Sequence, residues 1–193
     1  MTLLDSLVSQ GFRAFREPRE AAADVIALGV PREVLVPALT VIVILSVLLN
    51  AVGEMVAPTP LAAITHFQMS VFLLILFVSF AAAVYKVGQA LGGLGEWQDS
   101  LLLAIFFQAV FLPAQVLQVL LIIVLPPVAS LFGLAIFLFG LWVNVNFIAA
   151  LHGFPSLAKA LGVLVLASFV VAFIMAFVAP LIGISLFGGV PNV

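Results

Sequence analysis

Few side chains in this sequence can act as a nucleophile, an acid, a base or a metal ligand. It contains two histidines, His66 and His152, and no cysteine, so disulfides and thiolate metal sites are excluded. A zinc site needs three or four nitrogen, sulfur or oxygen ligands, which a lone histidine does not supply. The sequence also has no G-x-S-x-G, no H-E-x-x-H and no phosphate-binding loop. We therefore predict no catalytic, cofactor or metal site, and rank an intramembrane enzyme last.

Uncharged amide side chains form a first candidate cluster, because they lie inside long apolar segments. At 1.5 Å of rise per helical residue, Gln108 and Asn144 are expected at similar depth, and Asn50 near Gln115 and Gln118. One interpretation is that these groups, with Ser46, hold helices together by hydrogen bonds. The other is a groove for a lipid headgroup or a small polar solute. The cluster comprises Asn50, Gln108, Gln115, Gln118, Asn144 and Asn146.

A second candidate cluster consists of ionisable side chains near the ends of the apolar segments. Its members are Lys86, Glu96, Asp99, His152 and Lys159. There they can reach headgroups or water, and we expect His152, like His66, to be solvated at an interface. An ion-driven carrier normally needs an ionisable group deep in the membrane, and the sequence has none in the middle of an apolar segment. This pattern argues against a proton-coupled transporter.

Composition decides the class of fold that holds these residues. The chain is 66% hydrophobic and 7% charged, with a mean hydropathy of +1.43, whereas a soluble domain carries about a quarter charged residues. We predict an all-α, polytopic membrane helix bundle in which lipid is the solvent. A net charge of −2 argues against a nucleic-acid partner, which requires a concentrated basic face.

Five apolar segments are long enough to span a bilayer, after a short N-terminal region. Residues 1–30 are expected to form an amphipathic interfacial helix and a second short helix from Pro18 to about Gly29. The remaining residues, 31–193, form the predicted membrane domain, in which Pro113 is expected to kink the third span and Pro126-Pro127 to reverse the chain. Residues 61–64 are left open as an extra turn or a surface helix. The predicted spans are 34–56, 67–86, 99–124, 128–150 and 157–184.

Charge gives the orientation. With five spans, every Lys and Arg falls on the side of the N-terminus: four arginines precede the first span, Lys86 follows the second and Lys159 opens the fifth. By the positive-inside rule this side is cytoplasmic and the C-terminus lies outside. His66 and His152 then lie on opposite sides and cannot share a metal.

Three short motifs, in their order relative to the spans, resemble the Yip1 family of membrane proteins over nearly the whole chain. They are Phe15-Arg16-Glu17-Pro18-Arg19-Glu20, Gly92-Gly93-Leu94-Gly95-Glu96-Trp97-Gln98-Asp99 and His152-Gly153-Phe154-Pro155-Ser156-Leu157-Ala158-Lys159-Ala160. The resemblance implies five spans and, in eukaryotic relatives, residence in the early secretory pathway, contact with Rab-type GTPases and assembly with related proteins.

This chain departs from those relatives, because it has neither their long cytosolic N-terminal region nor their Asp-Leu-Tyr-Gly-Pro motif, and its one tyrosine is Tyr85. It is more similar to compact prokaryotic members, which implies a bacterial inner membrane. The expected function is non-enzymatic, through contact with membrane lipids, another membrane protein or a second copy. The alternative is a channel or carrier for a small polar solute or lipid.

Overall fold

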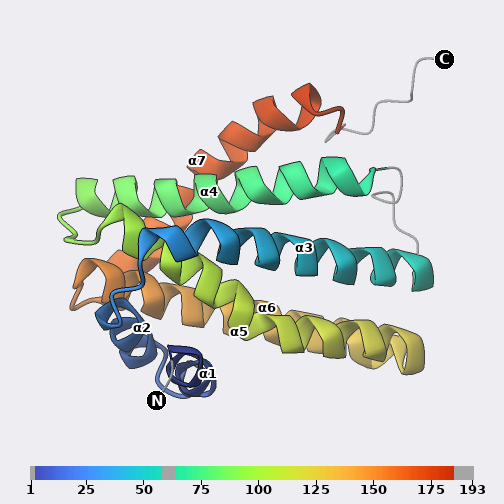
Figure 1. The fold of residues 1–193 in the computed structure, drawn as a ribbon, viewed down its shortest axis with the longest axis horizontal. Helices are drawn as coiled ribbons and strands as arrows, with labels where there is room; N and C mark the ends of the chain where they lie inside the picture. The colour runs from blue at the N-terminus through green and yellow to red at the C-terminus, as the bar shows by residue number, and fades with distance from the viewer. Residues whose placement is uncertain (1–2, 58–63, 185–193) are drawn as a thin grey trace.

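The computed structural model describes residues 3–57 and 64–184, and every regular element in this part of the chain is an α-helix. Two short helices come first, followed by five of 25 to 28 residues. The helices are α1 (Leu3–Arg13), α2 (Pro18–Ala27), α3 (Arg32–Val56), α4 (His66–Ala90), α5 (Trp97–Val124), α6 (Pro126–His152) and α7 (Leu157–Leu181) (Figure 1).

The five long helices have the length and apolar composition needed to cross a membrane. The predicted all-helical fold with five spans after a short N-terminal helix is therefore confirmed. Four of the helices continue further than predicted at one end of the bundle: α3 back to Arg32, α4 to Ala90, α5 back to Trp97 and α6 to His152. Hydropathy marks where the apolar core of a helix ends, whereas the helix itself continues for two to four residues beyond it.

Local signals explain several helix boundaries. Pro18 starts α2 and Pro126 starts α6, where a missing backbone N–H costs nothing. Leu125 alone separates α5 from α6, so the reversal predicted at Pro126-Pro127 is as tight as a single residue allows. A capping box that was not predicted starts α4: Thr65 and Gln68 satisfy each other's backbone N–H groups. The alternatives for residues 61–64 fall mostly outside the described residues.

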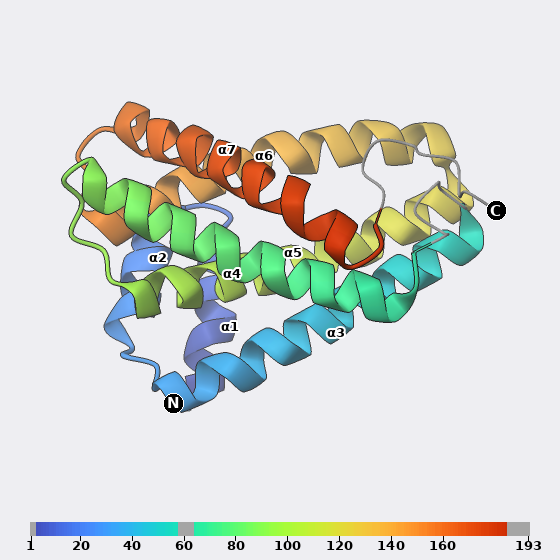
Figure 2. The same cartoon turned by 90° about the horizontal axis from the view of Figure 1, so that it is seen from above.

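The helix α5 passes through Pro113 without interruption. In Figure 1 its first half slopes across the bundle, whereas its second half runs alongside α6. The short helices α1 and α2 lie across the long ones (Figure 2). The helix α2 packs mainly on α6, and its residues Ala21, Ala22 and Val25 are fully buried. The N-terminal helices are thus docked onto the spans.

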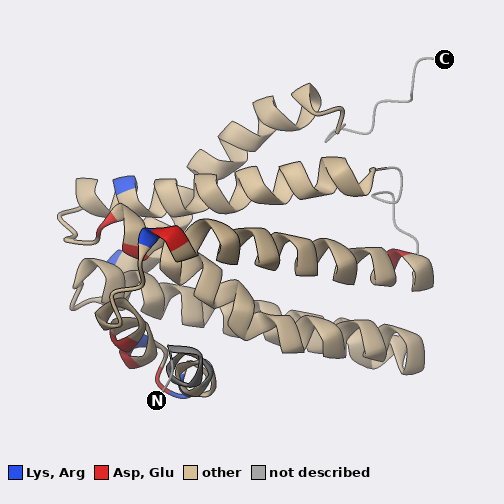
Figure 3. Cartoon of the chain, in the orientation of Figure 1, with Lys and Arg blue, Asp and Glu red and all other residues tan. Residues whose placement is uncertain are grey.

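We call the end of the bundle that carries α1, α2 and the loops at residues 91–96 and 153–156 the charged end, and the opposite end the apolar end. All six Lys and Arg residues gather at the charged end (Figure 3). Burial follows the same division, because the buried residues of α5 all lie between Ser100 and Phe111 and those of α3 between Leu35 and Val47. The well-packed core therefore sits toward the charged end.

Candidate functional site

A cavity of about 240 Å³ lies between α4, α5 and α6, within the half of the bundle nearer the charged end. Most of its lining is apolar, and four aromatic rings contribute to it: Phe77, Phe80, Phe107 and Phe147. Its polar lining residues are Ser100, Gln108 and Asn144. The structure thus brings together Gln108 and Asn144, the two amides that helical rise places at similar depth.

The described protein residues provide hydrogen-bond partners for only some of the polar atoms of these side chains. The Gln108 side chain donates from Nε2 to Ser46 Oγ of α3 at 3.1 Å, and Ser100 Oγ donates to the Ala81 carbonyl of α4 at 2.8 Å. Both bonds join different helices, as expected of polar contacts that hold a membrane bundle together. The Asn144 amide makes no hydrogen bond within the described part of the chain.

The other predicted amides do not line this cavity. Asn50 and Asn146 each donate to the carbonyl four residues earlier in their own helix, Ser46 and Trp142 respectively. Gln118 donates to the Ala129 carbonyl of α6, while its Oε1 atom is buried without a partner among the described residues. Asn50, Gln115 and Gln118 do not bond to one another in the described structure, so the outer group of amides forms no network.

His152, the last residue of α6, is buried with 1% of its surface exposed. The prediction that it is a solvated interfacial residue is wrong. Its Nδ1 atom accepts from the Gly95 N–H at 3.2 Å, so its Nε2 atom carries the proton and donates to the Val84 carbonyl, also at 3.2 Å. The neutral ring therefore joins α6 to α4 and to the loop between α4 and α5.

The glycines at residues 88–95 make room for this ring. A Cβ atom added at Gly88 would lie 2.0 Å from His152 Nε2, and one added at Gly93 would lie 2.4 Å from Nδ1. At Gly95 it would meet Leu151 Cγ at 2.7 Å. We name Gly88, Gly93 and Gly95 the glycine cradle. Sequence reasoning interpreted this run as a flexible turn with close helix packing; it missed the histidine, which lies 57 residues further along the chain than Gly95.

The three motifs that carry the family resemblance meet at this point of the structure. Gly95 and Leu94 donate backbone N–H groups to the ring and the carbonyl of His152. From the first motif, Arg19 donates to the carbonyl of Phe154 at 2.5 Å. The ring of Phe154 lies 5.3 Å from that of His152, centroid to centroid. The N-terminal helices, the α4–α5 loop and the α6–α7 loop are thus fastened together at the charged end.

The remaining members of the second candidate cluster do not pair with one another. Lys86 and Lys159 are exposed, and their ammonium groups lie over the rings of Tyr85 at 4.8 Å and Phe154 at 4.5 Å. Glu96 immediately precedes α5 and Asp99 lies in its first turn, and no ion pair joins either of them to the two lysines in the described structure. They surround a packed junction and do not form a charged pocket.

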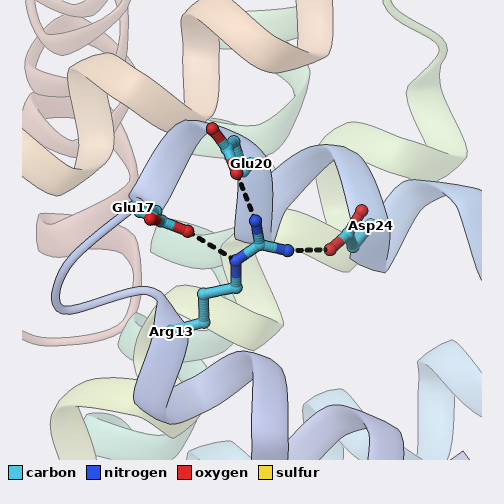
Figure 4. Close-up of polar contacts among 4 residues, drawn as sticks. All are labelled: Arg13, Glu17, Glu20 and Asp24. Carbon is cyan, nitrogen blue, oxygen red and sulfur yellow. Dashed lines mark hydrogen bonds and ion pairs between the residues drawn. The ribbon is translucent and has the colours of Figure 1, made fainter.

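Ion pairing centres on Arg13, the last residue of α1 (Figure 4). Its guanidinium contacts three carboxylates around α2: Glu17 at 2.8 Å, Asp24 at 2.6 Å and Glu20. The hydrogen bond from Arg13 holds the pKa of Glu17 below its ordinary value, and the charge of Arg13 acts in the same direction. This arrangement clamps α1 onto α2.

A larger cavity of about 540 Å³ lies between α1, α3 and α5 and is lined almost entirely by apolar side chains. Its lining includes Phe12 of α1, Phe15 of the connection between α1 and α2, and Phe106 of α5. None of the described residues that line it carries a polar side chain that could orient a polar ligand. The residues that the structure describes also hold no group of three or more His, Cys, Asp or Glu side chains placed to bind a metal ion.

Comparison with known proteins gives one match. The sequence matches the Yip1 domain over residues 12–192, a range that includes α2 and all five long helices. No curated protein and no solved structure matches the chain significantly.

Proposed function

Because the chain belongs to the Yip1 family of membrane proteins, we propose that it is a non-enzymatic integral membrane protein that acts through contacts of its spans with lipids, a partner membrane protein or a second copy. The observation that carries this proposal is the distribution of its surface. Outside the five long helices, the described residues form only two short helices and brief connections. Most of the surface through which the protein can act is therefore apolar and faces the bilayer.

A stripe of phenylalanines on α7 is the most prominent part of this surface. Phe169, Phe173 and Phe177 recur every four residues, and 62–70% of each is exposed. The opposite face of α7 is buried along the helix, at residues such as Val163, Ala167 and Val171. One face of α7 thus belongs to the core, and the other is open to lipid or to another transmembrane helix.

Extraction in a mild detergent tests this proposal. We expect native mass spectrometry to find a co-purifying membrane protein, a self-associated form or tightly held lipid. A photo-crosslinking residue at Phe173 should give discrete adducts in native membranes, whereas one at the exposed loop residue Leu94 serves as the control outside the spans. A monomer free of lipid and without adducts at Phe173 would contradict the proposal.

The proposed setting is a bacterial inner membrane with the charged end in the cytoplasm. The gathering of all six basic residues at that end supports this orientation. Reporter fusions at the two termini test it: we expect the N-terminal fusion to be active in the cytoplasm and the C-terminal fusion outside. Reporters that place both termini in one compartment would contradict the five-span topology.

A second candidate function is passage of a small polar solute or a lipid, and the amide-lined cavity favours it. Gln108 and Asn144 would then contact the passenger. Liposome flux and lipid-scrambling assays test this candidate, with Gln108→Leu and Asn144→Leu expected to reduce the rate. Transport that is unchanged in both variants would show that the passenger does not use this cavity.

A further inference from the structure

The polar groups of the cavity between α4, α5 and α6 have hydrogen-bonding capacity that the protein does not use. Asn144 presents two N–H donors and a carbonyl acceptor, none of which is bonded within the described residues. Gln108 uses one N–H to bond Ser46, and its carbonyl oxygen and second N–H have no hydrogen bond within the described residues. Unpaired amide groups within a membrane bundle cost free energy. A bound molecule that hydrogen-bonds to them would recover that cost.

The described lining also carries no charge. None of the described residues around the cavity is a Lys, Arg, Asp or Glu, so a charged ligand would lose its hydration without gaining a counter-charge, which costs several kcal/mol. The polar atoms that face the cavity are a hydroxyl and two carboxamides. The cavity can therefore recognise a ligand through hydrogen bonds between uncharged groups.

The volume and the aromatic lining of the cavity indicate the size and the apolar part of the ligand. An apolar cavity of about 150 Å³ accommodates benzene, so 240 Å³ suits on the order of ten non-hydrogen atoms. Phe77, Phe80, Phe107 and Phe147 surround this volume. An apolar body against these rings, with one oxygen-bearing end at Asn144, satisfies both parts of the lining.

We infer that this cavity binds an uncharged, membrane-soluble molecule that carries a hydroxyl or carbonyl oxygen on an apolar body of about ten non-hydrogen atoms. The oxygen accepts from the Asn144 amide, and a hydroxyl also donates to the Gln108 carbonyl. The inference names a ligand class for the second candidate function but requires only binding, not passage. The glycine cradle is adjacent to the cavity, because Val84, which lines the cavity, also accepts a hydrogen bond from His152.

Photolabelling in lipid nanodiscs tests the inference. The probe is a decanol that carries a diazirine in its alkyl chain, and labelled positions are mapped by peptide mass spectrometry. We expect labels on α4, α5 and α6 around the cavity, above the level on the lipid-facing stripe of α7, which reports nonspecific labelling. Excess 1-decanol should suppress the cavity labels, whereas decane and ionised decanoate should compete at least about fivefold less well, because one hydrogen bond contributes about 1 kcal/mol.

Matched variants connect the labels to the two amides. Asn144→Leu and Gln108→Leu should each lower cavity labelling about fivefold without changing labelling of α7. Gln115→Leu is the control, because Gln115 lies on the same helix as Gln108 but outside the lining. Ala104→Leu fills the cavity while keeping both amides, and should abolish labelling there. Monodisperse elution of each variant shows that it is folded.

Three results would overturn the inference. Competition by decane equal to that by 1-decanol would mean that the amides do not recognise oxygen. Cavity labelling that survives Asn144→Leu and Ala104→Leu in folded protein would mean that the probe binds elsewhere. Binding without flux would support the inference while contradicting the second candidate function, whereas flux without binding would overturn the inference alone.

Discussion

Within the long helices, several large side chains near the charged end are enclosed by neighbouring helices, whereas side chains of the same types toward the apolar end face outward. Phe106 and Phe147 are 6% and 3% exposed and stack with ring centroids 5.7 Å apart. Phe173 on α7 and Leu131 on α6 are 67% and 71% exposed. In Figure 1 the long helices correspondingly fan out from the charged end.

The difference teaches which forces hold this bundle together. Lipid tails are as apolar as leucine, so burying an aliphatic side chain between helices gains little over leaving it in the bilayer. Close packing forms instead where small residues let backbones approach and where hydrogen bonds cross between helices. The charged end has both: Ala149 and Ala160 are fully buried there, and His152 bonds to two other segments. At the apolar end large aliphatic residues dominate, and lipid solvates them about as well as a neighbouring helix would.

The largest expected difference between the two ends concerns phenylalanine. Phe106→Ala should lower the free energy of unfolding by on the order of 3 kcal/mol, because it leaves a void in a packed region. Phe173→Ala, the matched control, should change it by less than about 0.5 kcal/mol. Thermal unfolding in detergent measures both. Equal losses from the two variants would mean that the apolar end is as tightly packed as the charged end.

The glycine cradle should be the next most sensitive feature. Gly88→Ala places a methyl group 2.0 Å from the His152 ring, and we expect it to cost about 2 kcal/mol through overpacking. At Gly162 of α7 an added Cβ meets nothing within 4 Å. Gly162→Ala should therefore leave stability unchanged or raise it by up to about 1 kcal/mol, because alanine favours helix. If Gly88→Ala is as well tolerated as Gly162→Ala, the ring is not held as described.

Matched substitutions of the two histidines distinguish the contribution of the His152 hydrogen bonds to stability from the contribution of its packing. His152→Phe keeps an aromatic ring but leaves the buried Gly95 N–H unpaired, and should cost about 1–2 kcal/mol. His66 is exposed at the start of α4, so His66→Phe should have almost no effect. Amide hydrogen exchange at Gly95 provides a direct measurement, and we expect faster exchange in His152→Phe alone. Unaltered exchange there would show that the bond to Nδ1 contributes nothing.

The smallest expected effect is the pH dependence of the clamp between α1 and α2. Because the pKa of Glu17 is lower in the folded protein than its ordinary value of 4.5, its contribution is present above pH 4.5 and is lost as the pH falls through the folded pKa. Distances between spin labels on α1 and α2 should therefore increase at acid pH. Arg13→Gln should remove this dependence, whereas Arg16→Gln should retain most of it, because Arg16 is exposed, forms none of these ion pairs and lowers the pKa of Glu17 less than Arg13 does. A transition that persists in Arg13→Gln would assign the effect to another group.

Sequence alone determined the features of this protein that depend on runs of neighbouring residues. The lengths of its apolar segments gave the number of spans, since a helix must match the thickness of the bilayer. Pro126-Pro127 gave the reversal between α5 and α6, and helical rise placed Gln108 and Asn144 at one height. The capping box of Thr65 and Gln68 is equally local, and its residue types are visible in the sequence, but a hydropathy pattern does not register it.

Tertiary structure decided the rest, because it depends on which faces of distant helices meet. In the sequence, a glycine run is compatible with a simple turn, and a histidine at a helix end is compatible with exposure to water. Only the folded structure brings Gly88 and Gly95 against His152, which lies more than fifty residues further along the chain. The cavity depends in the same way on the rotation of α4, α5 and α6 about their axes. Hydropathy does not set that rotation, because these helices are apolar on every side and only the fit of small residues and hydrogen bonds selects the inward face.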